Sequence, residues 1–282
     1  MSTRWGLPGS APLFPEELME APRFPSTVRP FGGNHSLSLR GLPQLNSRNK
    51  IISALGEHAL VRLSPQLELV SFKTGQEIIK AGQSLEFFYF PETLVVSQLY
   101  YLADGGSAAA SIIGHDGVLG LSSLLNGGRA SYWAIASVGG TTRRIRVESL
   151  RWEFNNNILL QKLMLGYLGE RLLQLGQKSV CSTRHRLEER LCSWLLMILD
   201  RASSSTLPLT HAAIAEHLGV RRAGVTNFCN TLRDRGIIAT KRARLTILDR
   251  NALEGFACEC YHRLGLDGAG RVEAPQHGLP EK

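Results

Sequence analysis

The stretch HAAIAEHLGVRRAGVTNF occupies residues 211–228 and decides the fold of the C-terminal part of the chain. Ala215, Gly219 and Val225 stand four and six residues apart, the spacing of two short helices that cross at a steep angle. The small Ala215 lets the backbones approach, Gly219 permits a left-handed bend, and Val225 fills the space between the helices. The pattern predicts a helix-turn-helix whose second helix, Arg222 to about Asp234, reads the major groove of DNA.

The residues after this helix predict a β-hairpin that serves as a wing. Gly236 stands where a helix C-cap is expected. Ile237–Ala239 and Leu245–Ile247 have the composition of two short strands. The turn between them, Thr240–Arg244, is cationic through Lys241, Arg242 and Arg244. Such a turn can be a merely solvated loop, but beside a recognition helix we expect it to lie against DNA phosphates.

Basic charge is concentrated in the same region. The chain has 32 Lys and Arg against 24 Asp and Glu, a formal net charge of +8. Between Arg184 and Arg250 there are 12 basic and 6 acidic residues, so most of the excess falls there. This asymmetry is typical of a protein that binds a polyanion. A membrane surface is a poor candidate, because no Lys-rich amphipathic helix with aromatic anchors is present. Double-stranded DNA is the predicted partner.

Length and composition limit the remaining classes. The 282 residues, 43% of them hydrophobic, suffice for two globular domains. No apolar run is long enough to span a bilayer, and the N-terminus lacks the pattern of a secretory signal. The five cysteines, an odd number at scattered positions, do not resemble a disulfide framework. We therefore expect a cytoplasmic protein without membrane contact.

The chain divides into five parts. Residues 1–44 hold seven of the twelve prolines and are expected to form a disordered arm. Residues 45–150 begin with a short helical pattern and continue as brief apolar runs separated by turns, which predict an antiparallel barrel or jelly roll. Its expected strands are Leu67–Phe72, Glu77–Ile79, Phe87–Phe90, Val95–Leu102, Ala108–Ile113, Tyr132–Val138 and Thr142–Val147. The other parts are a helix over 151–181, the winged helix-turn-helix over 182–250, and a C-terminal helix and tail over 251–282. The fold class is α+β.

The segment 151–181 has no proline and carries a heptad repeat, so it predicts a long helix through which two chains dimerise. The repeat consists of Ile158, Leu165 and Leu172 at one position and Gln161, Leu168 and Leu175 at the other. Further apolar residues widen the stripe, so a flank of the helix can also pack on the barrel. A helix buried within one chain is the alternative. Helix-turn-helix proteins usually pair two half-sites, which favours the homodimer.

This order of a β-roll, a dimer helix and a winged helix-turn-helix resembles the Crp/Fnr family of bacterial transcription regulators over residues 45–250. The resemblance is carried by Leu209-Thr210, by Gly219 to Val225 (GVRRAGV) and by the wing. RLEERL at 186–191 and GHDGVLG at 114–120 resemble segments of the family as well. The resemblance implies a sensor domain of the cyclic-nucleotide-binding type.

The predicted effector pocket departs from the family members that bind cyclic nucleotides. Those members place Glu after Gly for the ribose hydroxyl, whereas here Val118 follows Gly117. Their phosphate-binding Arg directly precedes Ser or Thr, whereas here Ala130 separates Arg129 from Ser131. Each underpaired polar group would cost about 1–3 kcal/mol. The pocket is assigned to Gly117, Val118, Gly120, Arg129 and Ser131, and cyclic AMP is not expected to be the effector.

No cofactor or metal is predicted. Family members that hold an iron–sulfur cluster carry clustered N-terminal cysteines, and residues 1–44 contain none. His115 or His58 could ligate haem, although a lone histidine is usually a surface or core residue. Cys258-x-Cys260 resembles a ligand pair, but two residues on one helix at this spacing point to different sides, and no second pair follows.

The family resemblance also implies which residues contact DNA. Arg222 matches the arginine that contacts guanine, while Ala223 replaces a glutamate that accepts from cytosine, so the family operator is not transferred. Asn227 is suited to adenine, and Thr226 to a thymine methyl or a phosphate. The full predicted set is Thr210, Arg221, Arg222, Ala223, Thr226, Asn227, Lys241, Arg242 and Arg244.

The sequence therefore predicts a DNA-binding transcription regulator that senses an unknown signal, with RNA polymerase as a candidate further partner. An enzyme is not expected, because no HExxH, GxSxG or phosphate-binding GxxxxGK[ST] pattern is present. The alternative is a DNA-binding dimer whose barrel is purely structural and senses nothing.

Overall fold

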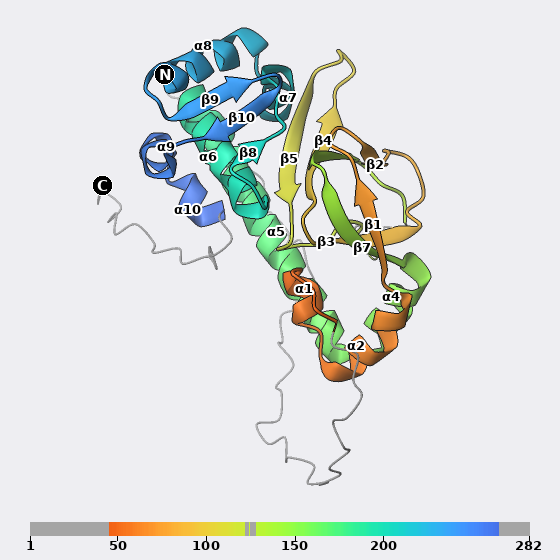
Figure 1. Cartoon of the computed structure of the whole chain (residues 1–282). Coiled ribbons are helices and arrows are strands. Elements are labelled where there is room, and N and C mark those ends of the chain that lie inside the picture. The colour runs from red at the N-terminus through yellow and green to blue at the C-terminus, as the bar shows by residue number, and fades with distance from the viewer. Residues whose placement is uncertain (1–44, 122–123, 125–127, 265–282) are drawn as a thin grey trace, which may run out of the picture. The chain divides into compact units, whose positions relative to one another are not determined.

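The computed structural model describes residues 45–121, 124 and 128–264 (Figure 1). The predicted disordered arm and the tail after residue 264 lie outside these residues. The N-terminal domain opens with α1 (Lys50–Ser53), α2 (Glu57–Leu63) and a 3-10 turn, η2 (Ser64–Gln66). Its strands are β1 (Glu68–Phe72), β2 (Glu77–Ile79), β3 (Phe87–Pro91), β4 (Val95–Tyr101), β5 (Ser107–Ile113), β6 (Trp133–Val138) and β7 (Gly140–Arg146).

The seven strands form the predicted antiparallel roll from two sheets, ordered β1-β7-β3 and β2-β6-β4-β5. Every predicted strand is found, with ends that differ by at most two residues. The inner faces bury Phe88, Leu119 and Ile145 in one core that also receives α1, α2 and the following helices. Burial of this apolar surface is the main stabilisation of the domain. The predicted α+β class is confirmed.

The predicted single helix after the roll is two helices, α4 (Val147–Asn156) and α5 (Ile158–Arg184). Asn157 stands between them in an extended conformation with φ −132° and ψ 102°. Its side-chain oxygen accepts hydrogen bonds from the amides of Leu159 and Leu160, which caps the first turn of α5. The expectation of one unbroken helix was wrong at this point, because an asparagine cap starts a new helix within an otherwise helical pattern.

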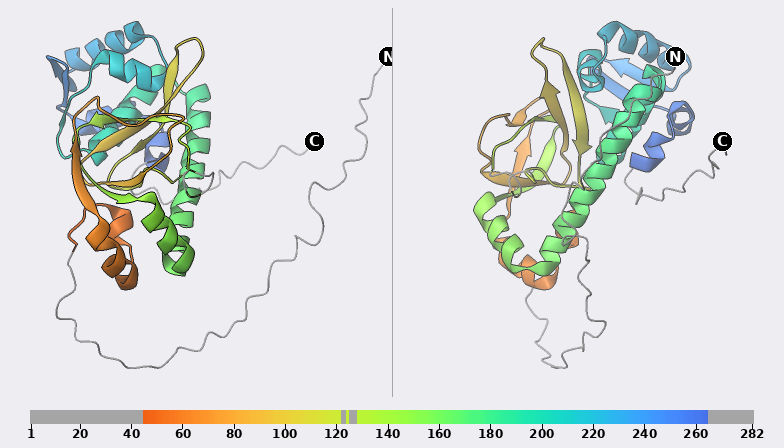
Figure 2. Two further views of the ribbon diagram at one scale, coloured as in Figure 1. Left: turned by 90° about the vertical axis from the view of Figure 1, so that its right-hand side faces the viewer. Right: turned by 180° about the vertical axis from the view of Figure 1, so that it is seen from behind.

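The long helix α5 runs beside the roll (Figure 2), and its apolar residues lie on two different faces. Leu160, Met164 and Tyr167 are buried in the core of the roll. The heptad residues lie elsewhere: Ile158, Leu165 and Leu172 are 60%, 48% and 62% exposed. Leu175 is also exposed, while Leu168 is half-buried. The alternative of a helix wholly buried within one chain therefore does not describe α5.

The C-terminal domain consists of α6 (Leu187–Arg201), β8 (Thr206–Leu207), α7 (His211–Leu218), α8 (Arg222–Asp234), β9 (Ile238–Lys241), β10 (Arg244–Ile247), α9 (Arg250–Phe256) and α10 (Cys260–Leu264). Strand β8, which the sequence did not predict, extends the wing into a sheet of order β8-β10-β9. A second core, with Leu195, Ile214 and Val225 at its centre, holds these elements together. No helix in the described part of the chain combines the length and apolar character that crossing a bilayer requires.

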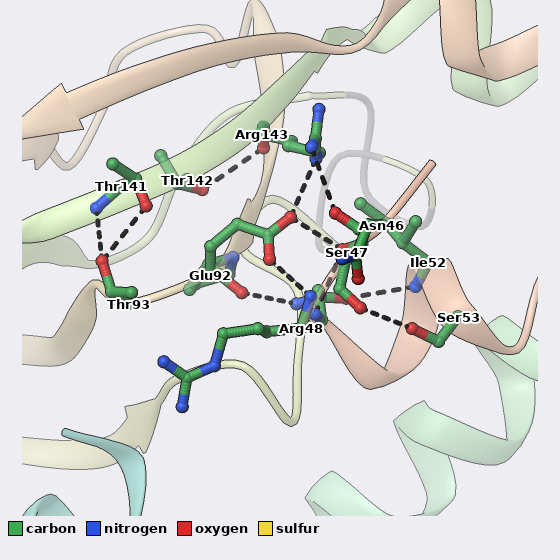
Figure 3. Close-up of polar contacts among 12 residues, drawn as sticks. Asn46, Ser47, Arg48, Ile52, Ser53, Glu92, Thr93, Thr141, Thr142 and Arg143 are labelled. Atoms are coloured by element: carbon green, nitrogen blue, oxygen red, sulfur yellow. Dashed lines mark hydrogen bonds and ion pairs between the residues drawn. The ribbon is translucent and has the colours of Figure 1, made fainter. Parts of the chain in front are cut away.

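The first described residues are held to the roll by one buried carboxylate (Figure 3). Glu92, just after β3, accepts hydrogen bonds from Ser47 Oγ at 2.7 Å, the Arg48 amide at 2.6 Å and Arg143 Nε at 2.8 Å. The Arg48 guanidinium in turn donates to Ser203 Oγ, just after α6, at 2.9 Å. This segment therefore joins the roll to the C-terminal domain.

Candidate nucleic-acid interface

The helix pair α7–α8 has the geometry that the sequence predicted. Thr210 Oγ1 accepts from the amide of Ala213 at 3.1 Å and caps the start of α7. Gly219 ends the helix in the left-handed region, with φ 66° and ψ 41°. Val225 is fully buried between the two helices. The cap at Thr210 and the left-handed Gly219 thus fix the angle between α7 and α8.

The recognition helix α8 spans Arg222–Asp234, as predicted. Its inner face, with Val225, Phe228 and Leu232, is buried in the domain core. The residues assigned to DNA lie on the other side: Arg221, Arg222, Ala223 and Asn227 are exposed, and Thr226 is half-buried. One face of the helix therefore anchors it, and the other is available to a ligand.

Two predicted residues of the helix pair also contact one another. Thr226 Oγ1 lies 3.1 Å from His211 Nδ1 at the start of α7. Burial and the nearby Arg222 lower the pKa of His211, which favours the neutral form of its ring. This hydrogen bond fixes the Thr226 side chain beside the exposed face of α8. No sequence pattern pointed to this contact of His211.

Gly224 explains how α8 approaches α6. A Cβ at this position would lie 2.9 Å from Cδ2 of Leu187, at the start of α6. Glycine weakens the interior of a helix by about 1 kcal/mol relative to alanine. Here it leaves room for close packing of the recognition helix on its domain.

The wing turn is tighter than predicted. Lys241 and Arg244 are the last and first residues of β9 and β10 and pair across the hairpin. Only Arg242 and Ala243 form the turn, both in the left-handed region with φ 47° and 61°. Such backbone costs of order 1–2 kcal/mol per non-glycine residue. Residues 241–244 are all exposed, so the hairpin presents its three cations to solvent.

The five cations assigned to DNA, two at the start of α8 and three in the wing, have no carboxylate partner among the described residues. Among residues 45–121, 124 and 128–264, no salt bridge involves the five cations Arg221, Arg222, Lys241, Arg242 and Arg244. Other arginines of the same domain, such as Arg233 and Arg250, do form such pairs. An array of unpaired positive charge beside an exposed helix face is suited to a phosphate backbone.

The residues assigned to an effector pocket are divided between two places. Gly117 and Val118 lie against α5, where the Tyr167 hydroxyl accepts from the Val118 amide at 3.2 Å. Val118 is only 2% exposed. Gly120 follows in the left-handed region with φ 97°. Arg129 and Ser131 are instead exposed, and Arg129 donates to the Gly82 carbonyl at 2.9 Å. Residues 122–123 and 125–127, between the two groups, lie outside the described part.

The comparisons with known proteins agree with this architecture. Residues 189–256 match the model of the Crp-like helix-turn-helix domain. The chain thus carries a Crp-like helix-turn-helix domain and is similar to transcription regulators of the Crp/Fnr type. The global nitrogen regulator of Synechococcus elongatus is 26% identical over 218 residues, which cover 74% of this chain and 97% of that protein.

Solved structures show the same Crp/Fnr fold. FixK2 from Bradyrhizobium japonicum has a TM-score of 0.57 at 18% identity, covering 68% of this chain and 98% of that one. A putative regulator of the Crp/Fnr family from Eubacterium rectale has a TM-score of 0.59 at 17% identity, covering 74% of this chain and 98% of that one. The matched helix-turn-helix domain and the similarity to the nitrogen regulators agree with the expectation that the chain is not an enzyme.

Proposed function

We propose that the protein acts in the cytoplasm as a homodimeric regulator that binds a roughly palindromic DNA site. The proposal rests on one observation: the chain has exposed heptad residues on α5, and it also has exposed cations without ion pairs at the start of α8 and in the wing. Dimerisation through α5 would present two copies of α8 to successive major grooves, about 34 Å apart. RNA polymerase is a further partner that activation would require.

Within each half-site, the proposed contacts divide into two kinds. Arg222 would donate two hydrogen bonds to guanine, and Asn227 would pair with adenine. Thr226, held by His211 at 3.1 Å, would contact a thymine methyl or a phosphate. Thr210, Arg221, Lys241, Arg242 and Arg244 would bind phosphates and set the register of the protein on the duplex.

Selection of random duplex oligonucleotides at low ionic strength tests this proposal. The full-length protein is expected to enrich a motif with two related halves, one helical turn apart. Recovery of no enriched motif would contradict sequence-specific binding. A motif with a single half, together with a monomer in sedimentation, would contradict the dimer.

We further propose that cyclic AMP is not the effector. The buried Val118 side chain stands where the family ribose acceptor is expected, and Arg129 is occupied by the Gly82 carbonyl. Calorimetry with cyclic AMP is expected to give no micromolar binding. The similarity to nitrogen regulators makes the nitrogen status of the cell a reasonable signal to examine first.

A purely structural roll remains the second candidate, and the buried Gly117–Val118 contact with α5 favours it. Native mass spectrometry distinguishes the two. A small molecule that co-purifies with the dimer supports a sensor, and a ligand-free dimer with full affinity for DNA supports the structural role.

A further inference from the structure

Four side chains with metal-binding atoms meet where α5 ends. Cys181 and His185 are four residues apart, so they lie on the same side of the helix end. Cys258 lies between α9 and α10, and Cys260 begins α10. One ligand atom from each residue falls within 4.8 Å of all the others. The group therefore joins residues that are more than 70 positions apart in the chain.

The distances fit one tetrahedral ion. Cys181 Sγ lies 3.6 Å from Cys258 Sγ, and Cys260 Sγ lies 3.5 Å from His185 Nδ1. With zinc bonds of about 2.3 Å to sulfur and 2.0–2.1 Å to nitrogen, the edges of a tetrahedron measure about 3.5–3.8 Å. An iron–sulfur cluster needs its thiolates further apart, because several metal and sulfide ions lie between them.

Neighbouring polar groups orient these ligands. The second ring nitrogen of His185, Nε2, lies 3.2 Å from a carboxylate oxygen of Glu259, which leaves Nδ1 for the ion. Ser193 Oγ accepts the Cys258 amide at 3.1 Å and lies 3.1 Å from Cys258 Sγ, to which its hydroxyl can donate. Gln177 Nε2 donates to Cys260 Sγ at 3.0 Å. A carboxylate behind the histidine and donors to the sulfurs are typical of protein metal sites.

Two other buried cysteines show what an ordinary core thiol looks like in this protein. Cys192 and Cys229 are free and buried in the apolar core of the C-terminal domain, and neither belongs to the four-residue group.

A disulfide between Cys181 and Cys258 would require a sulfur–sulfur distance of about 2.05 Å, whereas the two sulfurs lie 3.6 Å apart. A disulfide would also not explain why Cys260 and His185, with Glu259 behind the histidine ring, lie beside the same two sulfurs.

We propose that Cys181, His185, Cys258 and Cys260 bind one Zn²⁺ ion in a closed structural site. Three thiolates and one imidazole complete the tetrahedron, so no position stays open for catalysis. The expectation of no metal assumed that Cys258 and Cys260 share a helix and lack a second pair. In the structure Cys258 precedes α10, and the end of α5 provides the other two ligands, Cys181 and the C-cap residue His185.

The site would fix the joint between two parts of the regulator. His185 is the C-cap residue of α5, and α6 of the DNA-binding domain starts at Leu187. A bound ion would tie this joint to α10 and so limit how α5 and α6 move relative to each other. Metal binding and folding of this region are then linked.

Metal analysis of the full-length protein, purified without chelator and under reducing conditions, tests the proposal. About one zinc per chain is expected, which a closed Cys₃His site requires. Cys260→Ser and His185→Ala are expected to lose at least nine-tenths of it, whereas Cys229→Ala, a buried cysteine outside the group, retains it. Wild-type protein without zinc after anaerobic incubation with Zn²⁺, or full zinc in both variants, would overturn the assignment.

Cobalt substitution provides a readout that does not depend on variants. Co²⁺ added to the metal-free protein is expected to give intense visible bands of a tetrahedral thiolate site, which Zn²⁺ then abolishes. Absence of these bands, acid-labile sulfide in the purified protein, or a Cys181–Cys258 disulfide in non-reducing peptide mapping would each contradict the proposal.

Discussion

Asp116, in the loop after β5, and Arg201, the last residue of α6, form an ion pair with two hydrogen bonds. Arg201 Nε lies 3.0 Å from one carboxylate oxygen and Nη2 lies 2.6 Å from the other. The Arg201 side chain is 2% exposed and that of Asp116 is 16% exposed. Gly114 leaves room for the arginine, because a Cβ there would lie 2.8 Å from its side chain. The pair joins the roll to the DNA-binding domain.

This pair predicts a loss of stability in Asp116→Asn. Removing one member of a buried pair typically costs about 3–5 kcal/mol, because the other charge stays buried without compensation. Double-mutant analysis with Arg201→Met in urea unfolding measures the coupling. The double variant is expected to lose less than the sum of the single losses, and additive losses would contradict the pairing.

The same pair predicts a pH dependence. Burial alone would raise the pKa of Asp116, but Arg201 overcomes it and holds that pKa below its usual range. The stabilisation is therefore complete above the unfolded-state pKa of about 3.9, and it is lost as the pH falls below that value. The free energies of unfolding of wild type and Asp116→Asn, measured between pH 7 and pH 3, are expected to converge as the pH falls. A constant difference would exclude this titration.

Gly117→Ala is expected to destabilise the contact between the roll and α5. The added Cβ would stand 2.3 Å from the Tyr167 hydroxyl oxygen and 3.0 Å from the ring carbon that bears it. Overpacking of this kind costs about 1–3 kcal/mol. Tyr167→Phe alone leaves the Val118 amide unpaired, yet combined with Gly117→Ala it relieves part of the clash. In thermal unfolding, the double variant is expected to melt at a higher temperature than the sum of the two single decreases in melting temperature would give. Strictly additive decreases would argue against this clash.

Leu172→Glu is expected to weaken dimerisation without unfolding the chain. Leu172 is 62% exposed on the heptad face of α5, so a buried charge appears only when two chains pair through this face. Sedimentation over a concentration series measures the dimer. Leu69→Glu is the control, because Leu69 is comparably exposed on β1. An unchanged dimer in Leu172→Glu would place the interface elsewhere.

Arg222→Ala is expected to weaken binding to the selected operator by about 1–3 kcal/mol and to relax specificity at one base pair per half-site. The side chain is exposed at the first position of α8 and forms no ion pair within the described residues. Its loss should therefore cost little stability. Competition binding against a set of single-base operator variants measures the change, and an unaltered base preference would remove Arg222 from the reading residues.

Lys241→Ala is expected to weaken specific and nonspecific duplexes alike. A phosphate contact releases counterions, so the salt slope of binding should flatten by about one unit. Lys73→Ala, an exposed lysine on the roll, serves as the control and should leave the slope unchanged. An identical slope for wild type and Lys241→Ala would mean that the wing does not touch the backbone.

Much of the fold follows from patterns within a few residues. The Ala215–Gly219–Val225 spacing predicted the helix pair with α8 from Arg222 to about Asp234, and short apolar runs separated by turns predicted each strand of the roll. Propensity, turn chemistry and capping act over such short distances, so one sequence is enough to read them. The missed break at Asn157 belongs to the same class, because a cap within a helical pattern is a local signal.

The contacts that link distant segments could not be read in this way. Spacing in the chain brings neither Asp116 to Arg201, 85 residues away, nor Cys181 to Cys258, 77 residues away. Packing of the roll, α5 and the C-terminal helices creates these neighbours, because side-chain contact depends on how whole elements dock. Local chemistry thus specified the elements and the exposed face of α8. Their assembly alone gave the ion pair between the domains and the four-ligand group at the end of α5.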